Sequence, residues 1–348
     1  MKNIAAFALL SIALVSCKKE TATITKVDPK TGKTITVEVP ADSIKKVEAN
    51  PAIKDSLGVY KQTFKLKKGE TYPLTTYQRD IRTMTDPSGK TISGTSESTD
   101  EMTFKVDDIK GNVYDITINL ISKRSSQNSQ GKTVTIDTNS PAPKDDQMTM
   151  VWSINKALVG NKLQMKMDDH GKVISITGFD VVYKKISDVV AKIVKEKAQA
   201  NGVLGSLKQT FNEKVLKDQF EKNLSVLPKN GAKIGGKWTL SESADDAGKV
   251  KVTSNYQLKS VGNGIAEISV TGGIPKKTDK QKQGDMTHSL SSELSQDGTI
   301  KFDQNTGWIT HQNISVKTTQ VETIANAKES QSMKSVSNST VMVNPSAK

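Results

Sequence analysis

Three histidines and several adjacent aspartate pairs are the side chains of this 348-residue chain that are best suited to catalysis or metal binding. The histidines, His170, His288 and His311, form no His-Glu-x-x-His arrangement and no other metal-ligand spacing. His288 and His311 fall on predicted neighbouring strands, where a metal site completed by Asp303 is one alternative and two surface histidines are the simpler one. His170 falls in an Asp-Asp-His-Gly turn and is expected to be exposed. We therefore predict no metal site.

The adjacent aspartate pairs leave hydrolysis as an alternative function, because glycosidases need no more than two carboxylates that face each other across a cleft. Each pair falls in or beside a predicted turn, where aspartate accepts hydrogen bonds from backbone N–H groups. The chain has neither a phosphate-binding G-x-x-x-x-G-K-[ST] loop nor a G-x-S-x-G elbow. We predict no catalytic residue, no cofactor and no enzyme, with a hydrolase of envelope glycans or peptides as the alternative. The pairs are Asp107-Asp108, Asp145-Asp146, Asp168-Asp169 and Asp245-Asp246.

The only cysteine, Cys17, directly follows an apolar run at residues 4–15. A run of about a dozen residues has the length of a signal-peptide core and is shorter than the ~20 residues that cross a bilayer. Residues 14–17, Leu-Val-Ser-Cys, resemble a bacterial lipobox. That resemblance implies removal of residues 1–16 and attachment of a diacylglycerol to the Cys17 sulfur; the alternative is an ordinary buried thiol. A lone cysteine leaves no intramolecular disulfide to form.

A lipid on Cys17 would anchor the protein in the cell envelope. Each buried acyl CH₂ contributes ~0.8 kcal/mol, and two or more chains give stable attachment to a membrane. We therefore expect everything from Lys18 onward to lie outside the cytoplasm. The outer membrane is the favoured location, and its periplasmic and surface faces both remain open.

The formal net charge is +13, and arginine supplies only three of the 50 basic residues, namely Arg79, Arg82 and Arg124. Nucleic-acid and phosphate sites favour arginine, whose planar fork binds phosphate in a bidentate manner. The lysine excess therefore indicates a solvated surface and argues against a nucleic-acid partner, with weak attraction to an anionic membrane face as the alternative. The expected partners are the membrane, through the N-terminal lipid, and a protein or an apolar ligand.

The hydrophobic pattern predicts an α+β protein that is mostly antiparallel β. Alternating segments separated by glycine with asparagine or aspartate indicate strands and hairpin turns, whereas Val182, Ile186, Val189 and Ile193 form a helical stripe. We expect a large curved sheet or two related half-barrel-like lobes, with two to three helices in the middle. The predicted segments are a signal peptide (1–16), a lipidated Cys and flexible tether, part of which could fold as a hairpin (17–57), a first β lobe (58–178), a helical segment (179–227) and a second β lobe (228–348).

Three short segments of the first lobe recur in the same order in the second. Residues 104–118 align with 256–270, 69–74 with 235–240, and 131–140 with 298–307. This repetition predicts two similar β units, in which Val106 and Leu258 face the same side of their strands. Tyr72 and Trp238 occupy matching places, and each is predicted to fill the end of the sheet against a helix.

The segments "LKKGETY", "ALVGNKLQMKMDDHGKVISITG" and "LSVLPKNGAKIGGKWTL" resemble those of an uncharacterised family of Bacteroidota envelope lipoproteins, over residues 59–345. The resemblance implies an envelope location and the extent of the folded region. The strand-rich pattern is also similar to the half-barrels of periplasmic lipoprotein carriers. We expect a non-catalytic lipoprotein whose sheet binds a partner or an apolar ligand. Such a binder should show an apolar concavity, whereas a hydrolase should show convergent carboxylates with perturbed pKa values.

Overall fold

The computed structural model describes residues 21–27, 34–40, 51–243 and 250–345. Cys17, the predicted signal peptide and the pair Asp245-Asp246 lie outside the described residues. The chain divides into two units, residues 1–49 and 50–348. In the first unit, β1 (Thr21–Val27) pairs in antiparallel fashion with β2 (Thr34–Pro40), which confirms the predicted hairpin. Within the described ranges, no helix has both the length and the apolar character needed to cross a membrane.

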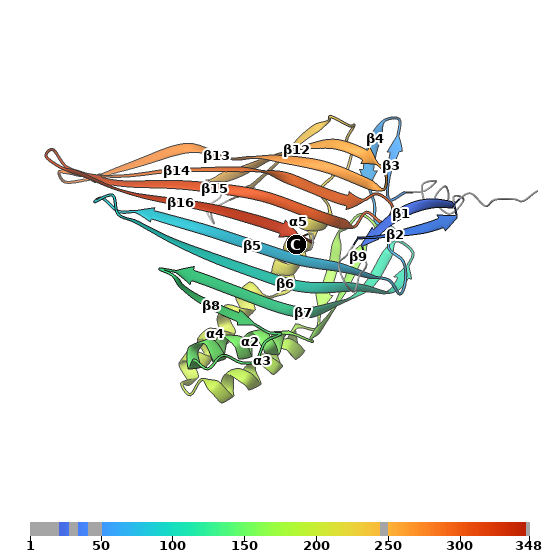
Figure 1. Cartoon of the computed structure of the whole chain (residues 1–348), viewed down its shortest axis with the longest axis horizontal. Coiled ribbons are helices and arrows are strands. Elements are labelled where there is room, and N and C mark those ends of the chain that lie inside the picture. Colours follow the sequence, from blue (N-terminus) through green and yellow to red (C-terminus); the bar gives the residue numbers. More distant parts are fainter. Residues whose placement is uncertain (1–20, 28–33, 41–50, 244–249, 346–348) are drawn as a thin grey trace, which may run out of the picture. The chain divides into compact units, whose positions relative to one another are not determined.

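The second unit is built on one open, antiparallel sheet (Figure 1), so both predicted β lobes contribute strands to the same sheet. Its strand order is β10-β9-β7-β6-β5-β16-β15-β14-β13-β12-β11, with β8 also paired to β7. The short strands β3 (Ile53–Ser56) and β4 (Val59–Gln62) form a separate pair. The predicted mostly antiparallel fold class is confirmed. The strands of the large sheet are β5 (Thr71–Thr85), β6 (Thr91–Lys110), β7 (Val113–Ser129), β8 (Lys132–Asp137), β9 (Lys162–Asp168), β10 (Val173–Thr177), β11 (Lys237–Ser243), β12 (Lys251–Gly262), β13 (Ile265–Gln283), β14 (Met286–Asp303), β15 (Ile309–Ala325) and β16 (Ser330–Val343).

Helix α2 (Asp146–Leu158) follows β8, and the predicted helical segment contains α3 (Phe179–Ile193), α4 (Lys197–Thr210) and α5 (Glu213–Leu224). Helices α4 and α5 are separate, and α5 begins after Asn212, whose side chain accepts a hydrogen bond from the Val215 N–H at 3.0 Å and caps the helix. Asp145 caps α2 in the same way, through the Met148 N–H at 2.9 Å.

Helix α5 contacts both edges and the middle of the large sheet. Glu221 accepts a hydrogen bond from the main chain of β10 at 2.8 Å, and Lys222 forms an ion pair with Glu242 of β11 at 2.7 Å. Phe220 packs edge-on against Phe104 of β6, with ring centroids 5.2 Å apart. In a flat sheet, ten strand spacings of ~4.8 Å would separate β10 from β11 by about 48 Å, whereas a helix is only ~10–12 Å across. The sheet therefore curves around α5.

The hydrophobic core occupies only the ends of the strands that lie nearest α5. On the 20-residue strand β6, Phe104 and Val106 are buried, and on the 18-residue strand β14, Ile300 and Phe302 are buried. We call the face that carries these side chains the inner face of the sheet. The remaining length of β5, β6, β7 and β13–β16 continues beyond the core (Figure 1).

The predicted repeat is visible in the hydrogen bonding of the two halves. Val106 and Leu258 are both fully buried, and the strand register shifts directly after each of them. The Gly69 N–H donates to the Val106 carbonyl at 2.8 Å, and the Gly235 N–H donates to the Leu258 carbonyl at 2.7 Å. The prediction that Val106 and Leu258 take equivalent, inward-facing places is therefore confirmed.

The third sequence match, of residues 131–140 with 298–307, is wrong. In the second half, Ile300 of β14 pairs with Ile268 of β13; in the first half the equivalent partner of Ile116 is Met165 of β9. Strand β8 and helix α2 are inserted between β7 and β9, and β8 pairs with a more distant part of β7. The sequence of β8 resembled the last residues of β14 because both are alternating segments that end in aspartate.

Candidate functional site

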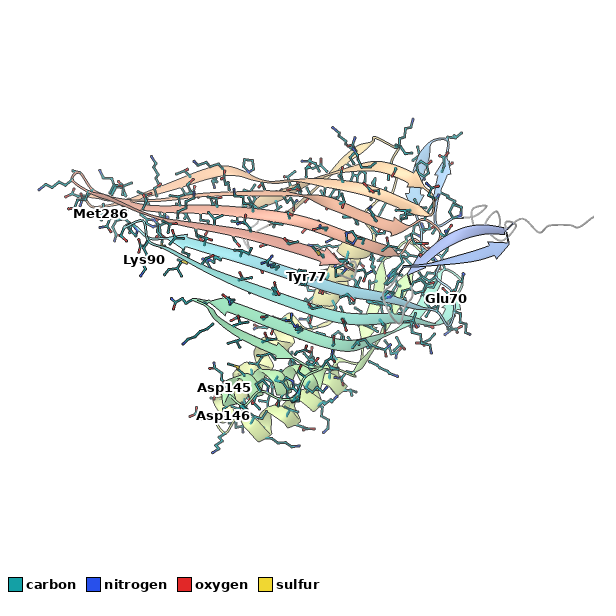
Figure 2. All side chains as sticks on the ribbon, in the orientation of Figure 1. Glu70, Tyr77, Lys90, Asp145, Asp146 and Met286 are labelled. Carbon is teal, nitrogen blue, oxygen red and sulfur yellow. The ribbon has the colours of Figure 1, made fainter. Side chains whose placement is uncertain are left out.

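Six large apolar side chains are exposed near the hairpin turns that lie farthest from α5. Each keeps between 37% and 46% of its surface exposed. We call this set the tip stripe. Figure 2 labels Met286 at this end of the sheet, with Lys90 in the turn between β5 and β6. The tip stripe consists of Ile92, Met84, Met333, Ile324, Leu290 and Met286.

Strand alternation places the whole tip stripe on the inner face. On β5 the buried residues Tyr72 and Leu74 define that face, and Met84 lies an even number of positions further along the strand. Met84 stands directly opposite Ile92 of β6. Even spacing from buried Ile300, Gln312 and Val343 places the other four there. From β6 to β14 the stripe crosses four strand spacings, about 19 Å.

The opposite, outer face of the same strand ends carries hydroxyl groups. Thr83 pairs with Ser93 at 3.2 Å and Thr323 with Ser332 at 2.8 Å, through their side-chain oxygens. Such cross-strand hydroxyl pairs are compatible with a wet sheet surface. The two faces therefore differ in chemistry at the same distance from the core.

Between the core and the tip stripe, the inner face mixes aliphatic and polar side chains. Leu294 and Val316 are half-buried there, and Gln296 donates a hydrogen bond to Ser254 at 2.6 Å. Gln296 reaches Ser254 across Gly272 of β13, where a Cβ atom would lie 2.0 Å from the Thr253 carbonyl. The inner face is thus a shallow, mixed surface rather than the deep apolar concavity that we expected of a ligand binder.

A depression of about 190 Å³ lies on the inner face beside the tip stripe, and Arg82 is its only charged lining residue. The Arg82 Nε donates to Ser335 Oγ at 3.4 Å. The other two arginines face the outer side, where Arg79 pairs with Glu97 at 3.3 Å and Arg124 with Asp137 at 4.0 Å. We call the depression the Arg82 pocket; Arg82, Thr318, Gln320, Ser335 and Ser337 line it.

The structure does not bring His288 and His311 together. His311 pairs with Lys301, which follows His288 by 13 positions on β14. At ~3.4 Å per residue the two are about 44 Å apart along the strand. His288 instead contacts Glu322 at 2.7 Å in the region of the tip stripe. The alternative of a metal site formed by His288, His311 and Asp303 is therefore excluded.

Asp303 and Asp168 hold equivalent turns in the two halves of the sheet. Asp303 Oδ1 accepts hydrogen bonds from the Asn305 and Thr306 N–H groups, at 3.0 and 2.7 Å. Asp168 Oδ1 likewise accepts from the His170 and Lys172 N–H groups, at 3.0 and 2.9 Å. His170 is exposed, as predicted. Asp168, Asp169 and His170 lie close enough to share a metal ion, and the turn already uses one oxygen of the Asp168 carboxylate, Oδ1.

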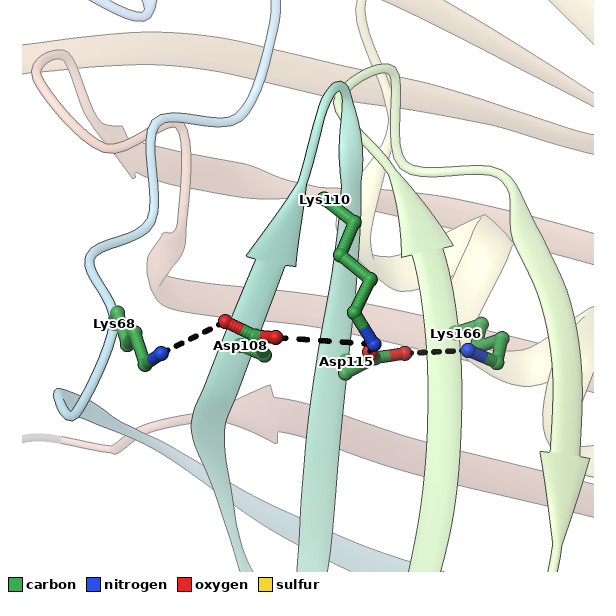
Figure 3. A network of polar contacts seen from close by, with 5 residues as sticks. All are labelled: Lys68, Asp108, Lys110, Asp115 and Lys166. Carbon is green, nitrogen blue, oxygen red and sulfur yellow. Dashed lines mark hydrogen bonds and ion pairs between the residues drawn. The ribbon is translucent and has the colours of Figure 1, made fainter.

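The carboxylates of Asp108 and Asp115 belong to a row of ion pairs on the outer face (Figure 3). Lys68 binds Asp108 at 2.8 Å, and Lys110 bridges Asp108 at 3.8 Å and Asp115 at 3.0 Å. Lys166 binds Asp115 at 2.7 Å. The row lies beside a depression of about 370 Å³ that Asp107 also lines, with the Thr117 hydroxyl donating to the Asp107 carboxylate.

The electrostatics of this row favour ionised side chains. The hydrogen bond from Lys68 lowers the pKa of Asp108, and hydrogen bonds from Lys166 and Lys110 lower the pKa of Asp115. The hydrogen bond to Asp115 raises the pKa of Lys110. A glycosidase needs one carboxyl group with a raised pKa, which acts as the general acid. The shifts at Asp108 and Asp115 have the opposite direction, so this arrangement does not favour the hydrolase alternative.

The aromatic residues of the core include one that the sequence interpretation missed. Trp308 is 3% exposed, packs against Tyr72 and Phe104 at centroid distances of 5.3 and 5.2 Å, and donates from Nε1 to the Pro73 carbonyl at 3.0 Å. The sequence feature that could have identified Trp308 is its place directly after Gly307, a turn residue with a φ of +75°. Trp238 is only partly buried, and it stacks on Tyr256 at 5.6 Å.

Several solved structures are similar to the chain at low identity. One, described as "Lipid-protein interactions in lipovitellin", has 11% identity and a TM-score of 0.35, with 82% of this chain and 26% of that chain covered. The chain thus spans about a quarter of lipovitellin. The COG4313 outer membrane channel of Pseudomonas putida F1 has 9% identity and a TM-score of 0.18, with 83% and 99% covered. At these TM-scores neither likeness bears on function.

The comparison with curated proteins gave no match. One family model matches residues 110–309, from the last residue of β6 to the first residue of β15. This range includes the helices α2–α5 and the strands β7–β14. The chain belongs to the family described as "Family of unknown function (DUF6263)".

Proposed function

We propose that this protein is a non-catalytic lipoprotein of the cell envelope that binds an apolar ligand along the inner face of its sheet. The tip stripe is the observation that carries the proposal. Its six exposed apolar side chains share one face, whereas hydroxyl pairs occupy the other face of the same strand ends. The same alternation places the pair of His288 and Glu322 on the inner face among these residues, so the apolar surface is interrupted there. Exposed apolar side chains gathered on one face of a sheet are nevertheless a feature of binding sites.

The ligand would cover side chains that the protein leaves half exposed. Burial of apolar surface contributes about 25 cal/mol per Å², or ~0.8 kcal/mol per CH₂ group. For a series of straight-chain alcohols, we therefore expect affinity to rise up to about fourfold with each added methylene. The open, shallow form of the surface suits a flexible aliphatic chain that lies along the sheet rather than a compact ligand in a closed cavity.

The proposed location rests on the N-terminal sequence. Residues 14–17 resemble a lipobox and the preceding apolar run has the length of a signal-peptide core. A lipid on Cys17 would hold the protein at a membrane, where long-chain ligands are concentrated. The outer membrane remains the favoured location.

The proposal is tested by binding of straight-chain alcohols to the full chain that carries Cys17→Ser, which needs no detergent. Displacement of a neutral fluorescent probe, N-phenyl-1-naphthylamine, measures affinity. We expect Met84→Ser with Ile92→Ser to weaken binding at least tenfold, because each change removes about 1 kcal/mol of apolar contact. Val181→Ser is the control, since Val181 is 69% exposed on α3 and does not belong to the tip stripe. Absence of binding, or equal loss in the control, would refute the proposal.

A further inference from the structure

We infer that the ligand is an anionic amphiphile, an aliphatic chain that ends in a carboxylate or phosphate group, and that the Arg82 pocket holds its head group. This inference rests on the proposed function, since the same ligand places its chain on the tip stripe. It adds the chemistry of the polar end and the residue that recognises it.

Within the described part of the chain, Arg82 differs from the other two arginines in having no acidic partner. Arg79 and Arg124 each pair with a carboxylate on the outer face. Among residues 51–243 and 250–345, no carboxylate lies within ion-pair distance of Arg82, and its side chain contacts Ser335. Arginine that faces hydroxyl groups without a counter-charge is suited to an external anion, which its planar fork binds in a bidentate manner.

The surroundings of Arg82 leave room for such an anion. Gly94 of β6 stands directly opposite Arg82, so no β6 side chain covers the guanidinium group from that side. On the other side Ser337 of β16 is opposite Arg82, and Thr318 of β15 is opposite Ser337. Their hydroxyl groups and the Gln320 amide are neutral donors that an anionic oxygen can share with the guanidinium group.

Asp80 is an acidic residue on the same strand and the same face as Arg82, although it does not line the pocket. It lies two positions before Arg82 on the inner face of β5, and the Gln78 amide donates to its carboxylate at 2.8 Å. Asp80 therefore opposes an incoming anion without neutralising Arg82. Removal of the Asp80 charge should therefore strengthen anion binding, which is the opposite of the effect expected for removal of the Arg82 charge.

The Arg82 pocket is continuous with the tip stripe. Met84 follows Arg82 by two positions on the same face, a distance of about 7 Å along the strand. Ser335 stands opposite Met84, and Met333 is the next inner-face residue of β16 after Ser335. A head group at Arg82 therefore leaves its chain free to extend over Met84 and Met333 toward the hairpin turns.

The test compares hexadecanoate, hexadecyl phosphate and the uncharged hexadecan-1-ol, all as monomers at low salt, on the full chain that carries Cys17→Ser. We expect both anions to bind at least tenfold more tightly than the alcohol. Arg82→Gln should reduce this preference to less than twofold without changing alcohol binding, and Arg82→Lys should keep only part of it. Asp80→Asn should increase it. Arg79→Gln, on the outer face, is the charge-matched control and should leave it unchanged.

The outcomes separate the inference from the proposed function. If the alcohol and the anions bind equally, or if Arg82→Gln keeps the preference, the inference is overturned while ligand binding on the tip stripe stands. If none of the three ligands binds, both are overturned. A preference for only one of the two anions supports the inference and identifies the head group. Thermal melting of each variant checks that the fold is retained.

Discussion

Two aromatic side chains, Tyr72 and Trp238, show what the sequence could and could not predict about the core. Tyr72 and Trp238 occupy the matching places that the sequence repeat predicts, each opposite an aromatic residue of the next strand. Their burial differs: Tyr72 is 8% exposed, whereas Trp238 is partly exposed and its buried Nε1 has no hydrogen-bond partner. The repeat pattern could predict the position of each aromatic residue. It could not predict which one the core would enclose, because that depends on Trp308 from a distant turn.

We expect Trp308→Ala to destabilise the protein more than Trp238→Ala. Trp308 contacts three aromatic rings and fills the core, so truncation should lower the free energy of unfolding by ~3–5 kcal/mol. Trp238 retains solvent contact, and its loss should cost less than half as much. Urea unfolding followed by circular dichroism measures both. An equal or larger loss for Trp238→Ala would contradict the assignment of Trp308 as the core residue.

At the level of the elements, the sequence predicted local structure more reliably than long-range pairing. The hairpins followed from alternation and turn residues, and α3 followed from its apolar stripe. The insertion of β8 and α2 was missed, because a short alternating strand carries no information about its partner. The contacts of α5 with both edges of the sheet also join distant segments, so no local pattern predicts them.

The candidate site was equally hard to foresee from sequence. Met84, Ile92 and Leu290 lie in ordinary alternating segments, whose apolar positions were expected to be buried. Their exposure follows from strands that continue past the core, and strand length relative to a distant helix cannot be read from a local pattern. The sequence does not distinguish Arg82 from Arg79 and Arg124, because the ion pairs of the last two with Glu97 and Asp137 depend on how the strands pair.

The outer-face ion pairs link β6, β7 and β9, and they should make stability depend on pH. The folded-state pKa values of Asp108 and Asp115 are lowered, so the unfolded state binds more protons between the folded and unfolded pKa values. The stabilisation is thus present above the unfolded pKa of ~3.9 and is lost as the pH falls through the folded value.

Asp115→Asn is the variant that tests this dependence. We expect a lower urea midpoint than that of the wild type at pH 7, and a difference that shrinks steadily below about pH 4. Asp297→Asn is the control, because Asp297 forms no ion pair within residues 51–243 and 250–345. A difference for Asp115→Asn that persists unchanged at pH 3 would show that the carboxylate charge is not what stabilises the three strands.

For the whole molecule, the proposed attachment to a membrane would depend on Cys17. We expect Cys17→Ser to abolish fatty-acid labelling and to move the protein from the detergent phase to the aqueous phase, because no other cysteine can carry the lipid. The melting temperature of the folded region, residues 50–348, should not change. Labelling that continues in Cys17→Ser would contradict the lipoprotein assignment.

The most direct test of the proposed function is to locate a bound aliphatic chain at single-residue resolution. A hexadecanoate analogue with a diazirine near its methyl end can be bound to the full chain, photolysed and mapped by tandem mass spectrometry. We expect adducts on tip-stripe residues such as Met84, Ile92 and Leu290, and few on the neighbouring outer-face residues Thr83 and Ser93. Adducts distributed equally over the two faces, or concentrated on α3 and α4, would contradict ligand binding on the inner face.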